Sequence, residues 1–228
     1  MWTSKEAGIR KKELLDAALE LFHESGYDNT SINDIINKVG VTKGAFYYHF
    51  NSKAEVLDTI ALQQAEEMVG VFFRASDENG KNALEKINRI ISAMQEYRSE
   101  TREKRLKIFE ILDKNENLKL RQKVYENYMR LSKPIVSKLI EQGVKEGIIK
   151  TAFSDELAEF YIQFSLSVNG TLNKLSLTLG EKPENIEILK KKAYFYEEMF
   201  VKILGVEKGS IEFAEPVLKS RILNDDRK

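Results

Sequence analysis

A short segment of the chain gathers side chains whose chemistry suits contact with a nucleic acid. The residues are Thr42, Lys43, Tyr47, Tyr48 and His49. A hydroxyl or an ammonium group can donate a hydrogen bond to a phosphate oxygen, and an aromatic ring can pack on a sugar or on a thymine methyl group. Two adjacent tyrosines are unusual on a surface that has only to remain in solution. These residue types therefore indicate a face that contacts the major groove of DNA.

The elements that must position this face are predicted from the apolar spacing before it. Apolar residues at i, i+3, i+4 and i+7 in the segment 32–39 predict one stripe of a helix. Ser31 can cap this helix, with Asp34 as its capping-box partner. Gly40 follows the stripe, where a chain leaving a helix commonly needs a positive φ. Thr42 can cap a second helix after this turn.

The second helix completes a helix-turn-helix motif, in which one short helix presents its outer face to DNA. Val41, Phe46 and Phe50 are expected to point inward. The candidate DNA-contacting residues on and around the motif are Ser31, Thr42, Lys43, Gly44, Ala45, Tyr47, Tyr48, His49 and Lys53.

A helix before the motif is predicted from the apolar stripe in residues 14–22, which ends at Ser25 and Gly26. Five short stretches occur in this order along the chain: Leu14–Phe22, Gly26-Tyr27, Thr30–Ile35, Gly40–Phe50 and Ser52-Lys53. Together they resemble the N-terminal domain of TetR-type (TetR/AcrR) transcriptional regulators. Val39 stands where many members have Ala. Beyond about residue 60 the resemblance is only architectural.

The resemblance implies a homodimeric, all-helical repressor that releases DNA when a small molecule binds its C-terminal domain. We therefore predict an all-α chain with a three-helix DNA-binding domain at 1–53. A larger effector-binding and dimerisation domain is predicted at 54–205, followed by a C-terminal tail at 206–228. Helices are expected near 54–73, 81–100, 104–113, 117–146, from 154 or 155, and at 184–204. Ser52 and Glu55 predict a capping box at the first of these.

Bulk charge does not by itself predict a nucleic-acid partner. Lys+Arg and Asp+Glu number 36 each, and residues 1–50 hold six basic and seven acidic side chains, a net charge of −1. The distribution is more informative, because no acid lies between Asp34 and Glu55, where Lys38, Lys43 and Lys53 fall. A weak overall field predicts modest non-specific affinity and reliance on specific contacts.

Several classes of protein are disfavoured by what the sequence lacks. Cysteine is absent, which excludes disulfides, and the N-terminus has no apolar signal core, so we expect a cytoplasmic protein without a membrane segment. The phosphate-loop, GxGxxG and GxSxG patterns are absent. Two histidines and no cysteine do not support a His/Cys metal cluster, and a site made of acidic residues is the alternative left open. We predict no metal and no cofactor, and because these motifs are missing we predict no enzymatic activity.

One C-terminal segment, 160–173, has no charged residue, which indicates a helix buried around most of its circumference. One side of this helix would line the interior of its own domain, and the other side would contact a second subunit. The last predicted helix would take part in the same contact. The candidate dimer-interface residues are Phe160, Leu166, Gly170, Leu189, Ala193, Tyr196 and Phe200. The alternative is that both helices belong to the core of a monomer.

An effector pocket is predicted only at the level of segments that surround the cavity in proteins of the resembled family. The candidates are Met94, Tyr97, Ile108, Phe109, Leu112, Tyr125, Tyr128, Met129, Phe164 and Asn169. An apolar cavity with a few hydroxyl and amide groups suits a small apolar or aromatic effector. Residue by residue, the alternative is ordinary core packing. The charged run 102–105 is interpreted as a solvated helix junction.

Two functional hypotheses follow. The first is a ligand-responsive repressor that binds a palindromic DNA operator as a dimer and is released by its effector. The second is a helical binding module that acts through a protein partner without reading DNA sequence. The net charge of −1 in the first fifty residues is the only feature that supports the second hypothesis.

Overall fold

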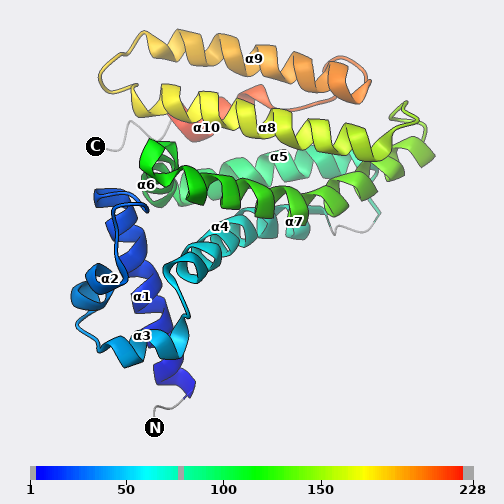
Figure 1. The fold of residues 1–228 in the computed structure, drawn as a ribbon. Helices are drawn as coiled ribbons and strands as arrows, with labels where there is room; N and C mark the ends of the chain where they lie inside the picture. Colours follow the sequence, from blue (N-terminus) through cyan, green and yellow to red (C-terminus); the bar gives the residue numbers. More distant parts are fainter. Residues whose placement is uncertain (1–3, 77–79, 223–228) are drawn as a thin grey trace. The chain divides into compact units, whose positions relative to one another are not determined.

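The regular structure of the chain is helical throughout the described residues, 4–76 and 80–222, of the computed structural model (Figure 1). This confirms the predicted all-α fold. The elements are α1 Ser4–Glu24, α2 Ile32–Val39, α3 Lys43–His49, α4 Lys53–Ser76, α5 Ala83–Glu100, α6 Arg102–Asp113, the 3₁₀ turn η1 Asn115–Asn117, α7 Leu118–Lys145, α8 Ser154–Leu177, α9 Asn185–Leu204 and α10 Ala214–Ile222.

Most helix boundaries lie within a few residues of those expected from the sequence, with two differences. The segment predicted as a tail contains α10. The predicted capping box of α4 is wrong in its second half: the Ser52 hydroxyl accepts from the Glu55 N–H at 3.1 Å, but the Glu55 carboxylate accepts from the N–H and side chain of Asn51. Glu55 therefore orders the turn one residue further back.

The chain divides into two compact units. The first unit comprises residues 1–66 and 107–128, and the second comprises 67–106 and 129–228. Helices α4, α6 and α7 each contribute residues to both units. The two compact units do not coincide with the domains predicted from the sequence, whose boundaries lie after residues 53 and 205. Those domain boundaries remain a prediction about which residues act together.

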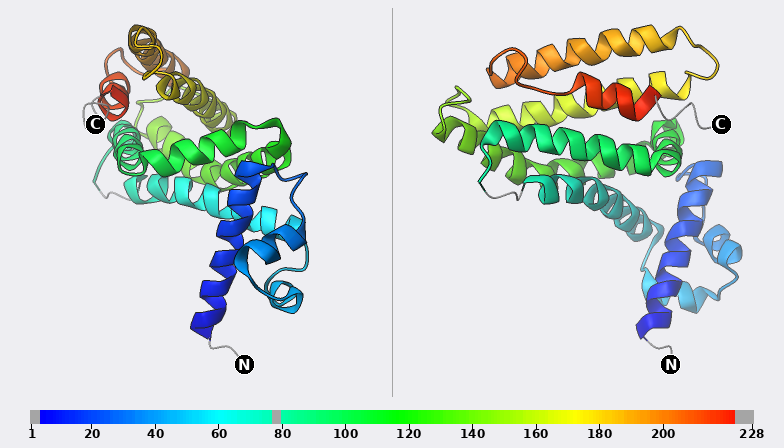
Figure 2. Two further views of the ribbon diagram at one scale, coloured as in Figure 1. Left: turned by 90° about the vertical axis from the view of Figure 1, so that its left-hand side faces the viewer. Right: turned by 180° about the vertical axis from the view of Figure 1, so that it is seen from behind.

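In the second unit, α8 and α9 lie side by side, and α10 packs against α9 and α5 (Figures 1 and 2). The contact of α10 is made by apolar side chains: Ile211, Phe213 and Val217 are at most 5% exposed. Burying such side chains is favourable by about 1.5–3 kcal/mol each. Apolar packing therefore holds residues 211–222 in the helical body of this unit.

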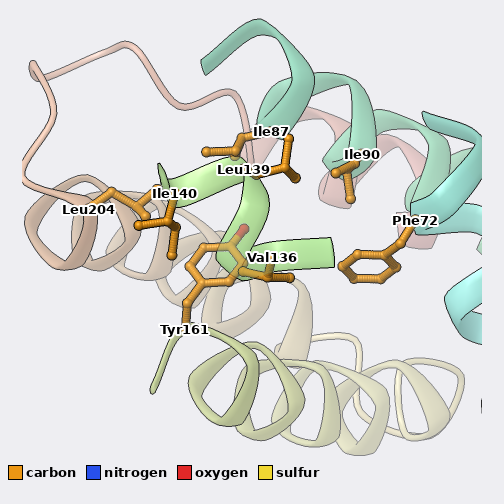
Figure 3. A pocket seen from close by; sticks show the side chains of 8 residues that line it. All are labelled: Phe72, Ile87, Ile90, Val136, Leu139, Ile140, Tyr161 and Leu204. Carbon is orange, nitrogen blue, oxygen red and sulfur yellow. The ribbon is translucent and has the colours of Figure 1, made fainter. Parts of the chain in front are cut away.

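A small apolar cavity lies inside the second unit (Figure 3). Its lining residues come from α4, α5, α7, α8 and α9: Phe72, Ile87, Ile90, Val136, Leu139, Ile140, Tyr161 and Leu204. The side chains in Figure 3 point toward a common space. This space has room for about one water molecule.

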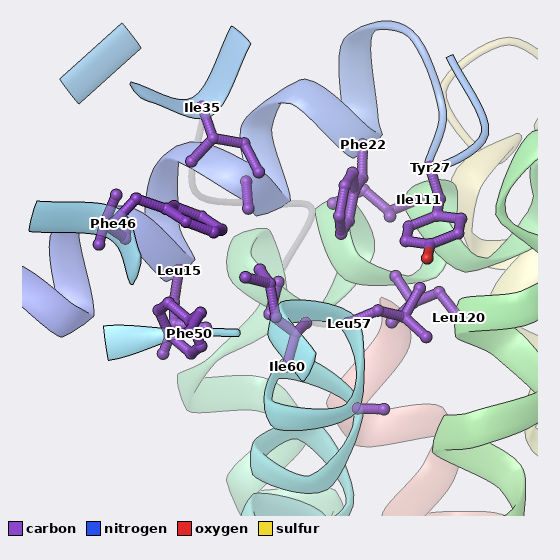
Figure 4. Packing of buried hydrophobic residues seen from close by; sticks show 14 of the residues in the cluster. Leu15, Phe22, Tyr27, Ile35, Phe46, Phe50, Leu57, Ile60, Ile111 and Leu120 are labelled. Carbon is purple, nitrogen blue, oxygen red and sulfur yellow. The ribbon is translucent and has the colours of Figure 1, made fainter. Parts of the chain in front are cut away.

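In the first unit, one apolar core joins α1–α4 to the segment 107–128 (Figure 4). Phe22, Phe46 and Phe50 contribute its large rings, and the 107–128 segment adds Ile111 and Leu120. All five side chains are at most 1% exposed. A three-helix domain of about fifty residues buries little surface alone, so the later segment supplies part of the core that the early helices lack.

A single buried amide links this later segment to the end of α1. Asn117, which is 0% exposed, donates to the main-chain oxygens of Phe22 at 2.8 Å and Ile111 at 2.9 Å. Its Oδ1 accepts from the Tyr27 N–H at 2.8 Å. Nearby, Gly26 has φ 84°, and a Cβ at that position would lie 2.3 Å from the Glu116 Cβ. The last turn of α1 therefore fits closely against η1.

We predict that Asn117→Ala lowers the free energy of unfolding by about 2 kcal/mol or more, because the buried Tyr27 N–H loses its acceptor and the main-chain oxygens of Phe22 and Ile111 each lose a donor. Urea denaturation followed by circular dichroism measures this change. Asn115→Ala, at an exposed position of the same 3₁₀ turn, is the matched control and should change stability by no more than about 0.5 kcal/mol. Equal losses in both variants would contradict the role of the Asn117 amide.

Candidate DNA-binding site

The helix-turn-helix motif is built by short-range hydrogen bonds. The Ser31 hydroxyl accepts from the Asp34 N–H at 3.1 Å, and the Asp34 carboxylate accepts from the Ser31 N–H at 2.7 Å. Gly40 ends α2 with φ 74°. The Thr42 hydroxyl accepts from the Ala45 N–H at 3.2 Å and caps α3. The predicted capping box, glycine turn and second cap are all confirmed.

The orientation of α3 separates an inner face from an outer face. Phe46 and Phe50 are 0% and 1% exposed and belong to the core of the first unit, and Val41 packs against that core. On the other side, Tyr47 and Tyr48 are 45% and 72% exposed. The two tyrosine rings therefore face solvent, as a helix that contacts DNA requires.

The hydroxyl groups that cap α2 and α3 can still donate a hydrogen bond. A hydroxyl has one proton to donate as well as its acceptor lone pairs. Ser31 and Thr42 accept from the backbone through oxygen, so each proton remains suited to donate to a phosphate. Gly44 is exposed and Ala45 is half-buried. A Cβ at Gly44 would approach only the Thr42 hydroxyl oxygen, at 3.9 Å. The small residues Gly44 and Ala45 therefore leave space for DNA to approach this part of α3 closely.

The three lysines of the acid-free segment have different environments. The Lys38 ammonium lies 3.3 Å from the Glu20 carboxylate and 3.0 Å from that of Glu24, both on α1. These acids raise the pKa of Lys38. Lys43 is exposed on α3, with its ammonium 6.0 Å from the centre of the Tyr47 ring. Lys38 therefore balances the acids of α1, and Lys43 adds positive charge to the outer face.

Lys53, also predicted to contact DNA, has a structural role. Its ammonium donates to the main-chain oxygens of Tyr27 and Thr30, each at 2.7 Å, and lies 4.2 Å from the centre of the Tyr27 ring. Burial lowers the pKa of Lys53. Two of its three protons thus hold the loop between α1 and α2, which leaves one for a ligand.

His49, at the end of α3, is half-buried. Burial, and then the charges of Lys11 and Arg10, lower its pKa from 6.5, so its imidazole is mainly neutral at pH 7 and adds little charge to the face. The sequence reasoning did not include Lys11 and Arg10. Lys11 lies 5.3 Å from the centre of the Phe50 ring, and only the packing of α1 on α3 reveals this proximity.

The ten predicted effector residues are divided between the two units. Ile108, Phe109, Leu112, Tyr125 and Tyr128 belong to the first unit, and Met94, Tyr97, Met129, Phe164 and Asn169 belong to the second. Ile108 and Leu112 pack on the core of the first unit, and Tyr125 is 43% exposed. None of the ten lines the cavity of Figure 3. Apolar spacing cannot distinguish a cavity wall from solid core, so the cavity residues were missed.

Part of the predicted dimer interface is wrong. Leu189, Ala193 and Phe200 are at most 2% exposed and pack inside their own chain, so they cannot contact a second subunit directly. Phe160 is 54% exposed on α8, whereas Leu166, Gly170 and Tyr196 are partly buried. The exposed apolar residues of α8 and α9 that the sequence reasoning missed are Leu177, Ile188, Tyr194 and Phe195.

Two further findings concern a metal site and a membrane-spanning helix. Within the ranges 4–76 and 80–222, no group of three or more histidine, aspartate or glutamate side chains is arranged to hold a metal ion. In the same ranges, no helix combines the length and apolar character needed to cross a membrane.

Comparison with known proteins identifies the motif. Residues 14–60 match the family described as "Bacterial regulatory proteins, tetR family". The HTH-type transcriptional regulator SrpR of Pseudomonas putida is 43% identical over 58 residues, which are 25% of this chain and 27% of SrpR. The fatty acid metabolism regulator protein of Bacillus subtilis (strain 168) is 29% identical over 152 residues, 63% of this chain and 75% of that protein.

Solved structures resemble the fold over most of the chain. SmeT, the repressor of the Stenotrophomonas maltophilia multidrug efflux pump SmeDEF, has a TM-score of 0.62 at 19% identity and covers 90% of this chain and 95% of its own. A complex of SmeT with triclosan has a TM-score of 0.66 at 20% identity, with coverage of 91% and 97%. These likenesses support the all-helical fold with an N-terminal helix-turn-helix.

The fold and motif define a protein with a helix-turn-helix domain followed by a larger helical domain. Residues 14–60, which contain the helix-turn-helix, are similar to the tetR family of bacterial regulatory proteins, and HTH-type transcriptional regulators are among the relatives that match this part of the chain. The resemblance noted from the sequence is thus confirmed. The first relatives match this chain over a quarter to two fifths of their own length.

We predict that Lys53→Met destabilises the protein by about 1–2 kcal/mol, because two main-chain oxygens lose a charged donor in a partly solvated site. Lys43→Met removes the same charge from the exposed face of α3 and should leave stability within about 0.5 kcal/mol of the wild type. Thermal unfolding of the two variants in parallel measures the difference. Equal stability of the two variants would show that Lys53 does not hold the loop.

Proposed function

We propose that the protein is a repressor that binds a palindromic DNA operator as a homodimer and is released by a small apolar or aromatic effector. The observation that carries the proposal is the outer face of α3, where Lys43, Tyr47 and Tyr48 are exposed within a motif that matches the tetR family. Because its proposed ligand is chromosomal DNA, we place the protein in the cytoplasm.

The chemistry of this face suits specific recognition more than charge attraction. Two exposed tyrosines offer rings for sugars and thymine methyl groups and hydroxyls for phosphates or bases. Lys43 adds a positive charge, and the acids Glu20 and Glu24 are paired with Lys38. The net charge of −1, which favoured the alternative of a protein-binding module, is unevenly distributed, since no acid lies between Asp34 and Glu55, the segment that contains α3. We therefore favour DNA over a protein partner.

A selection from a random duplex library, followed by fluorescence anisotropy, should yield a palindromic operator. For that operator, we predict that Tyr48→Ala weakens binding about 10- to 100-fold, the cost of one good base or phosphate contact. Lys43→Ala should weaken binding and reduce the salt-dependence slope by about 1, because one phosphate contact is lost.

Lys38→Ala is the matched control, since the Lys38 ammonium pairs with Glu20 and Glu24, and it should keep operator affinity within about threefold, because exposed ion pairs contribute little. Undiminished affinity in both Tyr48→Ala and Lys43→Ala would exclude α3 as the DNA-contacting helix. Weak, sequence-independent binding by the wild type would exclude the proposed function itself.

The proposed dimer uses the outer face of α8 and α9. Phe160 and Leu177 on α8, and Ile188 and Phe195 on α9, are between 36% and 54% exposed. Gly170 lies on α8, and a Cβ there would meet no atom of the same chain within 4 Å. Large exposed apolar side chains commonly mark an interface, and the open space at Gly170 suits a close approach between helices.

We predict that Phe195→Glu converts the dimer to a monomer, because a carboxylate would be buried without a partner in the interface. Sedimentation equilibrium at micromolar concentration measures the oligomeric state. Phe73→Glu, at a 60% exposed phenylalanine of α4, is the control and should remain dimeric. A monomeric wild type, or a dimer that survives Phe195→Glu, would contradict the proposed interface.

The proposed effector site is the apolar cavity of Figure 3, with Tyr161 as its one polar lining group. Apolar walls with a single hydroxyl suit a small apolar or aromatic molecule. Since the cavity holds about one water molecule, binding must separate the surrounding helices. The structural relative SmeT has a solved complex with triclosan, which supports an effector of this chemistry.

A further inference from the structure

Four arginines line a second small cavity, which lies in the second unit. Arg98 comes from α5, Arg102 and Arg105 from α6, and Arg221 from α10. Arg98 and Arg221 are only 8% and 7% exposed. The solvated junction expected at 102–105 holds for Glu103 and Lys104, which are exposed, whereas Arg102 and Arg105 line this cavity.

Among residues 4–76 and 80–222, the hydrogen-bond partners of Arg221 are neutral. Its Nη1 donates to the Asn173 Oδ1 at 2.9 Å and to the Ser176 hydroxyl at 3.1 Å. Its Nε and Nη2 are buried and have no hydrogen-bond partner among the described residues. A guanidinium group carries five N–H donors, so a large part of its donor capacity and its full charge remain uncompensated in a site removed from water.

The surrounding charges do not supply the missing compensation. Burial, and then the positive charges of Arg105 and Arg102, lower the pKa of Arg221 to about 9. A nearby acid, Glu67, already accepts from the Lys104 ammonium at 2.7 Å and from the Tyr97 hydroxyl at 2.7 Å. Its charge is shared with these donors.

Helix ends compensate part of the charge. Ser176 lies in the last turn of α8 and Arg221 in the last turn of α10. The carboxyl end of a helix carries about half a negative charge at most. This fraction explains why a cation is tolerated here, but it does not balance the full charge of Arg221, and isolated buried charges are strongly disfavoured.

We propose that the arginine cluster binds an oxyanion, either a carboxylate or a phosphate group, whose oxygens accept hydrogen bonds from Nε and Nη2 of Arg221. Guanidinium groups bind both kinds of oxyanion through paired N–H donors. The interior of the cavity is only a few water molecules in size, which suits a single oxyanion group and not a bulky ligand. This site does not depend on the proposed operator or on the apolar cavity.

The test measures anion binding by the purified full-length protein without DNA, in Tris-chloride buffer at constant ionic strength. Sodium phosphate and sodium acetate are the two probes, followed by isothermal titration calorimetry and thermal unfolding. We expect saturable binding of at least one probe, with Tm rising by about 5–10 °C at a hundred times its Kd. Which probe binds distinguishes a phosphate from a carboxylate site.

Arg221→Met keeps the length of the side chain but removes its charge. We expect it to weaken binding of the probe at least tenfold while its Tm in plain buffer equals or exceeds that of the wild type, because an unpaired buried charge has been removed. Arg89→Met, at an arginine paired with Glu96 on the surface of α5, is the control for general effects of phosphate and should bind as the wild type does.

The proposal would be overturned if the wild type binds neither probe, or if Arg221→Met binds the probe as well as the wild type does.

Discussion

The first unit depends on one buried side chain, Asn117, which joins segments far apart in the sequence. Its amide accepts from the buried Tyr27 N–H and donates to the main-chain oxygens of Phe22 and Ile111, and buried polar groups of this kind are nearly always hydrogen-bonded. Because the geometry of an amide allows little freedom, η1 and the last turn of α1 must keep a fixed relation. The helix-turn-helix therefore rests on a scaffold that includes residues near 117, and not only on the fifty residues of the motif.

Three lysines near this scaffold have different roles because their surroundings differ. Lys38 balances the acids of α1, Lys53 holds the loop before α2, and Lys43 faces solvent on α3. A lysine bound to two main-chain oxygens has little left for a ligand, whereas an exposed one can contact phosphate. The field at the motif is thus weaker than a count of lysines suggests, which favours recognition through tyrosine and hydroxyl contacts.

In the second unit, different sides of the same helices contribute to three different sites. The inner faces of α8 and α9 form a core with Ile162, Leu172 and Leu189. Their outer faces carry exposed apolar side chains such as Phe160 and Phe195. At the end of α8, polar residues meet the arginine cluster. One helix thus contributes to core packing, to the proposed subunit interface and to the proposed oxyanion site.

Local interactions explain what could be read from the residues alone. The caps of α2 and α3, the left-handed turn at Gly40 and most helix limits depend on contacts within four residues, and all were predicted correctly. The partners of Lys38 and Tyr27 lie 14 and 90 residues away, and only the fold brings them together. The same holds for Arg221, for the cavity walls and for the inward turn of Leu189. Apolar spacing shows that a helix has a buried face, but the neighbours that cover that face are decided by tertiary packing.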